Sequence, residues 1–200
     1  MGIPQFDYTY TVDQYLAFEE QSDIRHEFLD GLVYAMAGES LEHSTICSNL
    51  VIEVGTQLKG TRCRTLSPNM KVLAGENGLF AYPDVTVMCG EPVFVVGRRD
   101  VIINPSVIFE VLSPATEAFD RGEKFLRYRT HNKTLTDYIL VSQRKPLIEH
   151  FFRQPSGEWG FRSVEHGILD VASINCKLRL SEVYDRIIFP AFPETMIREV

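Results

Sequence analysis

The sequence has few of the features that mark a secreted, membrane or zinc-knuckle protein. It contains no apolar run of about eighteen residues and no basic leader before an apolar stretch, so we expect neither a membrane span nor a secretion signal. The four cysteines, Cys47, Cys63, Cys89 and Cys176, include no C-x-x-C pair and indicate neither a zinc knuckle nor a disulfide framework. We therefore expect free thiols and a cytoplasmic protein.

Nucleotide-binding and hydrolase motifs are missing as well. No G-x-G-x-x-G follows a predicted strand and no G-x-x-x-x-G-K-S/T occurs, so neither a dinucleotide-binding fold nor a P-loop is supported. The absence of G-x-S-x-G leaves an α/β-hydrolase without its nucleophile. The formal net charge of -7 argues against a protein that coats nucleic acid by bulk electrostatics. It does not exclude a nuclease, because acids that bind a metal add negative charge at the site itself.

The composition that remains is typical of a globular protein, with 44% hydrophobic and 24% charged residues in 200, and we expect one domain over residues 1–200. Capping signals and four-residue apolar spacing predict helices over residues 11–21, 41–58, 116–131 and 181–186. A hairpin is predicted at Asp30-Gly31, and strands over residues 63–66, 70–74, 82–88, 107–112, 136–141, 147–153 and 159–162. Residues 90–105 read as a loop. This order predicts a layered α/β or α+β domain with a mixed central sheet.

Two of the predicted strands each carry an acid where a buried strand should have none. Asp84 lies in Y-P-D-V-T-V-M and Glu110 in V-I-F-E-V-L-S. A carboxylate among apolar side chains must be protonated, paired with a cation or bound to a metal. The loop predicted over residues 90–105 joins these two strands, so they can lie side by side with both acids on one face of the sheet. Hard cations such as Mg²⁺ or Mn²⁺ prefer such oxygen ligands, and the carbonyl of Val111 is a further candidate ligand.

Three other polar residues are candidates for the same site. Lys124, one helical turn before Tyr128, can orient a metal-bound water or offset charge on a phosphate. Glu27, ahead of the hairpin, is a candidate third acid, ligand or base. His43 is a candidate general base, a ligand or a structural hydrogen-bonding residue.

Each candidate also has a purely structural interpretation. Asp84 can be a turn residue after proline, and Glu110 can belong to a buried ion pair. Lys124 can lie on a solvated helix face, and Glu27 can cap the hairpin or pair with Arg25. Tyr128 is typical of a core residue and Ser113 of a cap. The arginines at 98, 99, 121, 127 and 129 fit phosphate contacts and an ordinary charged surface equally well.

Taken in order, these residues resemble the Uma2 family, also catalogued as DUF820, of the PD-(D/E)xK or restriction-endonuclease-like superfamily. The residues that carry the resemblance are Pro83-Asp84, Glu110 to Pro114, Lys124, Tyr128 and Asp137 to Val141, with Glu27 and His43 matching the family's earlier pattern. The resemblance covers residues 27–153. It implies a mixed central β-sheet flanked by α-helices, with Asp84 and Glu110 as Mg²⁺ ligands and a lysine assisting the attacking water. Leu112 stands where the D/E-x-K lysine belongs, and Lys124 matches the family's lysine on the following helix.

The first hypothesis is a Mg²⁺-dependent endonuclease that hydrolyses DNA phosphodiester bonds through Asp84, Glu110 and Lys124, with Glu27 in support. We expect a homodimer, since two symmetric sites most simply cut two strands. The alternative is a catalytically inactive nucleic-acid-binding or regulatory module, which Leu112 and the acidic charge favour. A third hypothesis is a metal hydrolase of a small phosphoester.

Overall fold

A six-stranded mixed sheet forms the centre of the molecule in a computed structural model that describes residues 8–36, 38–76 and 78–189. Its strands, in spatial order, are β11 (Trp159–Val164), β10 (Ile148–Arg153), β9 (Asp137–Ser142), β8 (Val107–Leu112), β6 (Val85–Cys89) and β3 (Cys63–Leu66). The neighbours β8 and β9 run parallel, and the other neighbouring pairs are antiparallel. This arrangement confirms the mixed central sheet that the order of elements predicts.

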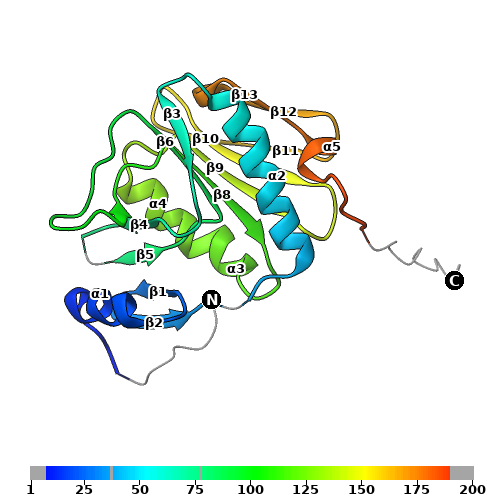
Figure 1. Cartoon of the computed structure of the whole chain (residues 1–200). Helices are drawn as coiled ribbons and strands as arrows, with labels where there is room; N and C mark the ends of the chain where they lie inside the picture. The colour runs from blue at the N-terminus through cyan, green and yellow to red at the C-terminus, as the bar shows by residue number, and fades with distance from the viewer. Residues whose placement is uncertain (1–7, 37, 77, 190–200) are drawn as a thin grey trace, which may run out of the picture.

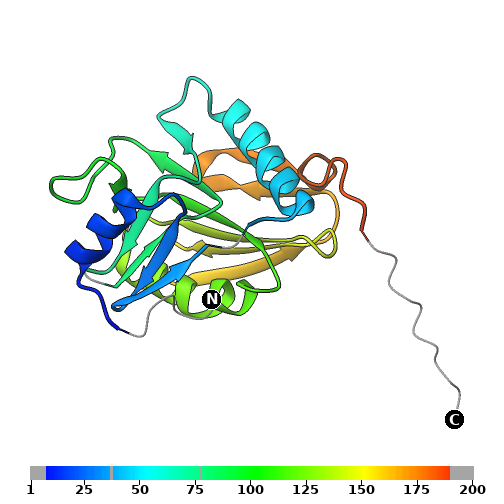
Figure 2. The same cartoon turned by 60° about the horizontal axis from the view of Figure 1, so that its bottom comes forward.

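Helices cover both faces of this sheet (Figures 1 and 2). On one face lies α2 (Leu41–Leu58), and on the other α3 (Glu117–Phe119), a π-helical turn η1 (Asp120–Lys124) and α4 (Phe125–His131). Successive side chains of β8 point to opposite faces of the sheet. Val107 and Phe109 pack in the core with α2, whereas Ile108 and Leu112 pack with α4. Burial on both faces explains why β8 reads as one apolar run, and why Glu110 stands out in it.

A second sheet of five strands lies beside the first. Its order is β2 (Leu32–Ala35), β1 (His26–Leu29), β5 (Leu79–Ala81), β4 (Lys71–Ala74) and β7 (Val101–Ile102), and α1 (Val12–Gln21) packs on it. The capping box of α1 forms as predicted, with Thr11 and Gln14 each bonding the other's backbone N–H. The hairpin turns at Asp30 and Gly31, whose φ angles of 48° and 94° are those a two-residue turn requires.

Several elements differ from the prediction. The short strands β5 and β7 were not expected, nor were β12 (Ile168–Val171) and β13 (Cys176–Arg179), which form a two-stranded sheet. A 3-10 turn, η2 (Ala172–Ile174), joins the latter two, and α5 (Leu180–Val183) is shorter than predicted. Strand β6 begins at Val85, so Asp84 precedes the strand instead of lying in it. Within the described ranges, no helix is long and apolar enough to cross a membrane.

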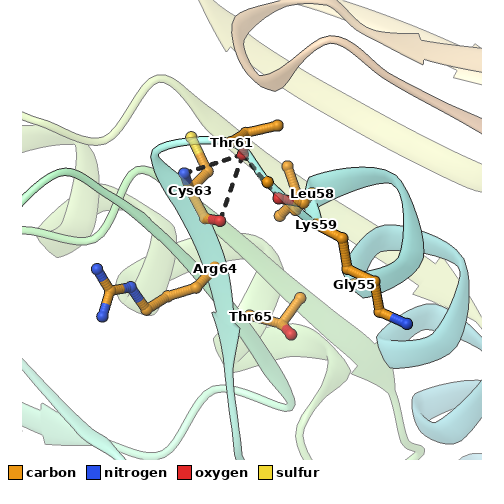
Figure 3. A pocket seen from close by; sticks show the side chains of 8 residues that line it. Gly55, Leu58, Lys59, Thr61, Cys63, Arg64 and Thr65 are labelled. Atoms are coloured by element: carbon orange, nitrogen blue, oxygen red, sulfur yellow. Dashed lines mark hydrogen bonds between the residues drawn. The ribbon is translucent and has the colours of Figure 1, made fainter.

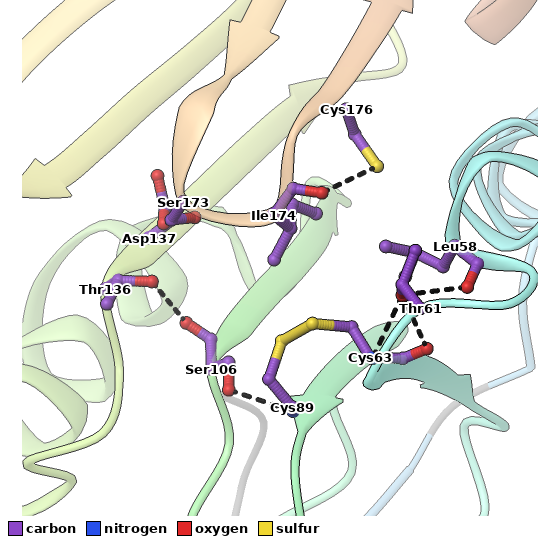
Figure 4. Close-up of a disulfide and its surroundings, with 10 residues drawn as sticks. All are labelled: Leu58, Thr61, Cys63, Cys89, Ser106, Thr136, Asp137, Ser173, Ile174 and Cys176. Carbon is purple, nitrogen blue, oxygen red and sulfur yellow. Dashed lines mark hydrogen bonds between the residues drawn. A yellow bond between two sulfur atoms is a disulfide. The ribbon is translucent and has the colours of Figure 1, made fainter.

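The expectation of free thiols is wrong for two of the four cysteines. Cys63 and Cys89 form a disulfide across neighbouring strands (Figure 4), whereas Cys47 and Cys176 are free. Strands β3 and β6 are antiparallel, and their register places Cys63 directly opposite Cys89. The two residues are 26 positions apart, so only the strand register brings them together.

A buried acid ties the central sheet to the β12–β13 unit. Asp137 Oδ1 is 2.6 Å from His150 Nε2, and Asp137 Oδ2 accepts a hydrogen bond from Ser173. Arg162 Nε donates to His150 Nδ1 at 3.1 Å, so that nitrogen carries no proton and Nε2–H donates to Asp137. Burial by itself raises the pKa of Asp137, but the hydrogen bonds from His150 and Ser173 outweigh burial and hold the pKa below its usual value.

We expect this acid to make folding stability depend on pH. Because the folded-state pKa of Asp137 is lowered, its contribution is complete above the unfolded-state pKa of about 4 and is lost as the pH falls through the folded-state pKa. Asp137→Asn should therefore lower the free energy of unfolding by about 1–3 kcal/mol at pH 7 and by progressively less below pH ~4. Urea unfolding across this range measures both proteins. The exposed Asp170→Asn is the control, and a difference that stays constant with pH contradicts the assignment.

Candidate active site

The acids Asp84 and Glu110 meet where strand β6 begins. The register pairs Val85 with Phe109, so one residue further along Asp84 comes opposite Glu110. The backbone N–H of Val111 donates to Asp84 Oδ2 at 2.7 Å, which fixes the carboxylate against β8. In a strand, the N–H and C=O of one residue point to the same edge, so the carbonyl of Val111 also faces the side on which Asp84 lies. Two carboxylates and a main-chain oxygen thus gather at this end of the sheet.

Lys124 reaches this cluster from the helical layer. Its Nζ lies 3.0 Å from Glu110 Oε1, 3.2 Å from Glu27 Oε1 and 3.4 Å from Asp120 Oδ1. Only 5% of its side chain is exposed, so the solvated-face interpretation is wrong. Burial by itself lowers the pKa of Lys124, but the charges of Glu110, Glu27 and Asp120 raise it well above its usual value. Lys124 is therefore a buried cation surrounded by three acids.

Asp120 also belongs to the cluster, although it is not among the site residues predicted from the sequence. It is buried and begins the π-helical turn that ends at Lys124. Its backbone carbonyl accepts a hydrogen bond from the Tyr138 hydroxyl at 2.9 Å, which anchors the turn to the central sheet. Single π-helical turns within helices occur often at functional sites. The four-residue spacing between Asp120 and Lys124 is the sequence feature that indicates their contact.

The cluster holds more acidic than basic side chains. Glu110 Oε1 is shut off from solvent, and among the described residues it accepts no hydrogen bond, although Lys124 Nζ is 3.0 Å away. Burial raises the pKa of Glu110 well above its usual value; the charge of Lys124 opposes this effect, and those of Asp120, Asp84 and Glu27 add to it. A buried carboxylate oxygen without a hydrogen bond, beside other oxygen donors, fits a hard divalent cation.

His43 approaches Asp84 from the opposite helix layer. It lies in the first turn of α2, where its backbone N–H donates to the capping residue Ser40 at 3.1 Å. His43 Nε2 is 3.3 Å from Asp84 Oδ2, and Nδ1 is 3.2 Å from Glu39 Oε2. Burial lowers the pKa of His43, but the hydrogen bonds and charges of Asp84 and Glu39 outweigh it and raise the pKa to about 9. The histidine is thus held between two carboxylates.

The remaining candidates fit the structural interpretations of the sequence. Tyr128 is fully buried in the core, and Ser113 Oγ accepts a hydrogen bond from the Thr116 N–H at 3.2 Å, as a cap does. The arginines contact acids or rings of their own chain: Arg98 pairs with Glu20 and Asp100, Arg121 with Glu117 and Glu149, and Arg127 with Asp30 and Glu123, while Arg99 and Arg129 lie over Phe94 and Phe125. These contacts favour the charged-surface interpretation of the set.

A hollow elsewhere on the molecule is separate from the acids. It lies where α2 ends and β3 begins, and Figure 3 shows Lys59, Cys63, Arg64 and Thr65 among its lining residues. Cys63 pairs with Cys89 at the far end of β6, whereas Asp84 precedes the near end. At about 3.3 Å per residue, the length of β6 separates the hollow from the acids.

Comparisons with known proteins identify the family and the fold of the chain. A family model named Uma2 and described as "Putative restriction endonuclease" matches residues 12–179. Two uncharacterized proteins of Synechocystis sp. are similar: one is 33% identical over 88% of this chain and 92% of its own length, the other 32% identical over 74% and 84%. A crystal structure titled as "a putative nuclease belonging to DUF820" from Anabaena variabilis superposes with a TM-score of 0.72 at 16% identity. It covers 90% of this chain and 99% of its own, and shows a shared fold.

Proposed function

The chain belongs to the Uma2 family, and on this basis we propose that it is a divalent-metal-dependent endonuclease that hydrolyses DNA phosphodiester bonds. The observation that carries the proposal is the cluster of Asp84, Glu110 and Lys124, in which Glu110 and Lys124 are buried. A carboxylate pair beside a protonated lysine is suited to phosphoryl chemistry, in which negative charge develops on oxygen atoms. The family description and the restriction-endonuclease-like fold support the same class of reaction.

The residues present fit a hard cation such as Mg²⁺ or Mn²⁺. We assign it to the carboxylates of Asp84 and Glu110 and to the carbonyl of Val111, because Mg²⁺ is usually held by one or two carboxylates together with water and substrate phosphate. Glu110 Oε1 accepts no hydrogen bond among the described residues, and Lys124 Nζ, 3.0 Å away, is its ion-pair partner. When bound, the cation lowers the pKa of a water molecule and stabilises charge on the phosphate.

Leu112 occupies the lysine position of the D/E-x-K pattern, and we assign the role of that lysine to Lys124. Its Nζ lies 3.0 Å from Glu110, so a lysine on the helical layer reaches the acid that a strand lysine would accompany. Because its pKa is raised, Lys124 stays protonated and acts as a hydrogen-bond donor and positive charge, not as a base. Glu27 and Asp120 hold its ammonium group in place. Oriented in this way, Lys124 can position the attacking water or bind a phosphate oxygen.

Cleavage of supercoiled plasmid DNA tests the proposal. We expect nicked or linear products with Mg²⁺ or Mn²⁺ and none with a chelator, and we expect the protein to elute as a homodimer in size-exclusion chromatography. RNA and small phosphoesters in the same assay separate a DNA endonuclease from a hydrolase of other substrates. Metal binding without cleavage of any substrate would contradict the proposal and favour the inactive module that Leu112 suggests.

A further inference from the structure

We propose that Glu39, His43 and Cys47 form a second metal site, which takes a transition-metal dication such as Zn²⁺. The three side chains each offer one donor atom, and these atoms all lie within 4.8 Å of one another. Nitrogen, sulfur and carboxylate oxygen together are a donor set typical of Zn²⁺, whereas Mg²⁺ is bound by oxygen alone. This inference does not depend on nuclease activity, since its three ligands differ from those assigned to Mg²⁺ and its test measures metal binding alone.

The start of α2 brings the three donors together. His43 and Cys47 are one helical turn apart and therefore lie on the same face of the helix. Glu39 immediately precedes the capping residue Ser40, and its carboxylate contacts His43. The carboxylates of Glu39 and Asp84 supply negative charge beside the positive end of the helix dipole, which would otherwise disfavour a cation there.

Two of the three spacings between donor atoms match tetrahedral coordination, and the third, between Glu39 and Cys47, is within 4.8 Å. Zn–N and Zn–S bonds of about 2.0 and 2.3 Å place the nitrogen and sulfur about 3.5 Å apart, and a nitrogen and a carboxylate oxygen about 3.3 Å apart. The corresponding distances are 3.5 Å from Cys47 Sγ to His43 Nδ1 and 3.2 Å from Glu39 Oε2 to His43 Nδ1. The same atom of His43 makes both contacts, so one cation beside Nδ1 can be reached by all three residues.

The other nitrogen of His43 provides independent support. Its Nε2 lies 3.3 Å from Asp84 Oδ2, in the place where histidine ligands of metals usually donate a hydrogen bond to a carboxylate. Such a carboxylate holds the proton on Nε2, so that Nδ1 can bind the cation once it has released its own proton. Glu39 is half-exposed while His43 is nearly buried, so water can complete the coordination on the Glu39 side. Asp84 thereby links the two metal sites through His43.

Cobalt(II) binding to the chelator-treated full-length protein tests the proposal, because tetrahedral Co²⁺ bound to a thiolate absorbs strongly in the visible and near ultraviolet. We expect one such Co²⁺ per chain. The titration is done without reductant, so that the Cys63–Cys89 disulfide stays closed and its thiols do not bind Co²⁺. Zn²⁺ should displace it and millimolar Mg²⁺ should not. Wild-type protein that shows only the weak absorption of hydrated Co²⁺ would overturn the proposal.

Matched variants identify the ligands. Cys47→Ser should abolish the thiolate absorption, whereas Cys176→Ser should retain it, since Cys176 is the other free thiol. Glu39→Gln, at an exposed residue before α2, should weaken Co²⁺ binding, and Glu42→Gln, at an exposed residue in the first turn of α2, should not. Asp84→Asn should keep the spectrum but weaken affinity about 10- to 100-fold, as loss of a ligand's hydrogen-bond partner does. Thiolate absorption that persists in Cys47→Ser, with the fold checked by circular dichroism, would refute the site.

Discussion

Asp84→Asn is expected to reduce metal-dependent DNA cleavage at least about 100-fold while the protein stays folded. The amide keeps the shape of the side chain and can still accept the hydrogen bond from the Val111 N–H, so the start of β6 should keep its place. It removes one of the two negative charges assigned to the metal, and a neutral amide is a much poorer ligand for Mg²⁺. The loss should therefore appear in catalysis and in metal affinity together.

Two measurements on Asp84→Asn separate a lost ligand from a damaged fold. Calorimetry with Mg²⁺ should show weaker binding than in wild type, and the thermal midpoint without metal should change little. The control is Asp23→Asn, because Asp23 is an exposed acid that is not one of the cluster residues. Cleavage at the wild-type rate by Asp84→Asn would remove this residue from the reaction and the proposed metal site with it.

Lys124→Met is expected to lower the free energy of unfolding by about 3–5 kcal/mol in the absence of metal. Methionine fills a similar volume, so the loss comes from charge more than from packing. It leaves Glu27, Glu110 and Asp120 buried together without their shared cation, which is the most unfavourable way to break a buried ion pair. Urea unfolding at pH 7 measures the difference. The exposed Lys133→Met is the control and should change stability by less than about 0.5 kcal/mol.

Divalent metal should partly reverse the destabilisation caused by Lys124→Met. A cation bound by Glu110 and Asp84 supplies positive charge to the same cluster, so Mg²⁺ should raise the unfolding free energy of the variant more than that of wild type. DNA cleavage should stay low even when stability recovers, because the metal does not supply the hydrogen bonds of the ammonium group. Full activity in the stabilised variant would assign Lys124 a structural role alone.

Local sequence patterns determined most of the secondary structure. The capping box at Thr11, the Asp30-Gly31 turn and the four-residue apolar spacing of residues 41–58 each depend on neighbours within a few positions, and each element formed as predicted. Two burial anomalies, Asp84 and Glu110, were also visible in the sequence, because an acid in an apolar run is unusual wherever the strand lies. Their pairing was expected because strands joined by the loop predicted over residues 90–105 can lie side by side.

The sequence did not determine what surrounds those acids, because these contacts join residues far apart in the chain. Register between β3 and β6 placed Cys63 opposite Cys89, which no local spacing indicates. The sequence places Lys124 in a charged helix, but packing of the π-helical turn on the sheet buries its side chain. The same packing places Asp120 beside Lys124 in the cluster.

The environment of Asp84 shows the same division. The sequence by itself determined an acid at the entrance to an apolar strand, next to a proline that fixes the local backbone. The tertiary structure alone decided that β8 would hold this carboxylate by a backbone N–H and that α2 would bring His43 to it from the other layer. Contacts of this kind form only when sheet register and helix packing are both complete, since each partner comes from a different element.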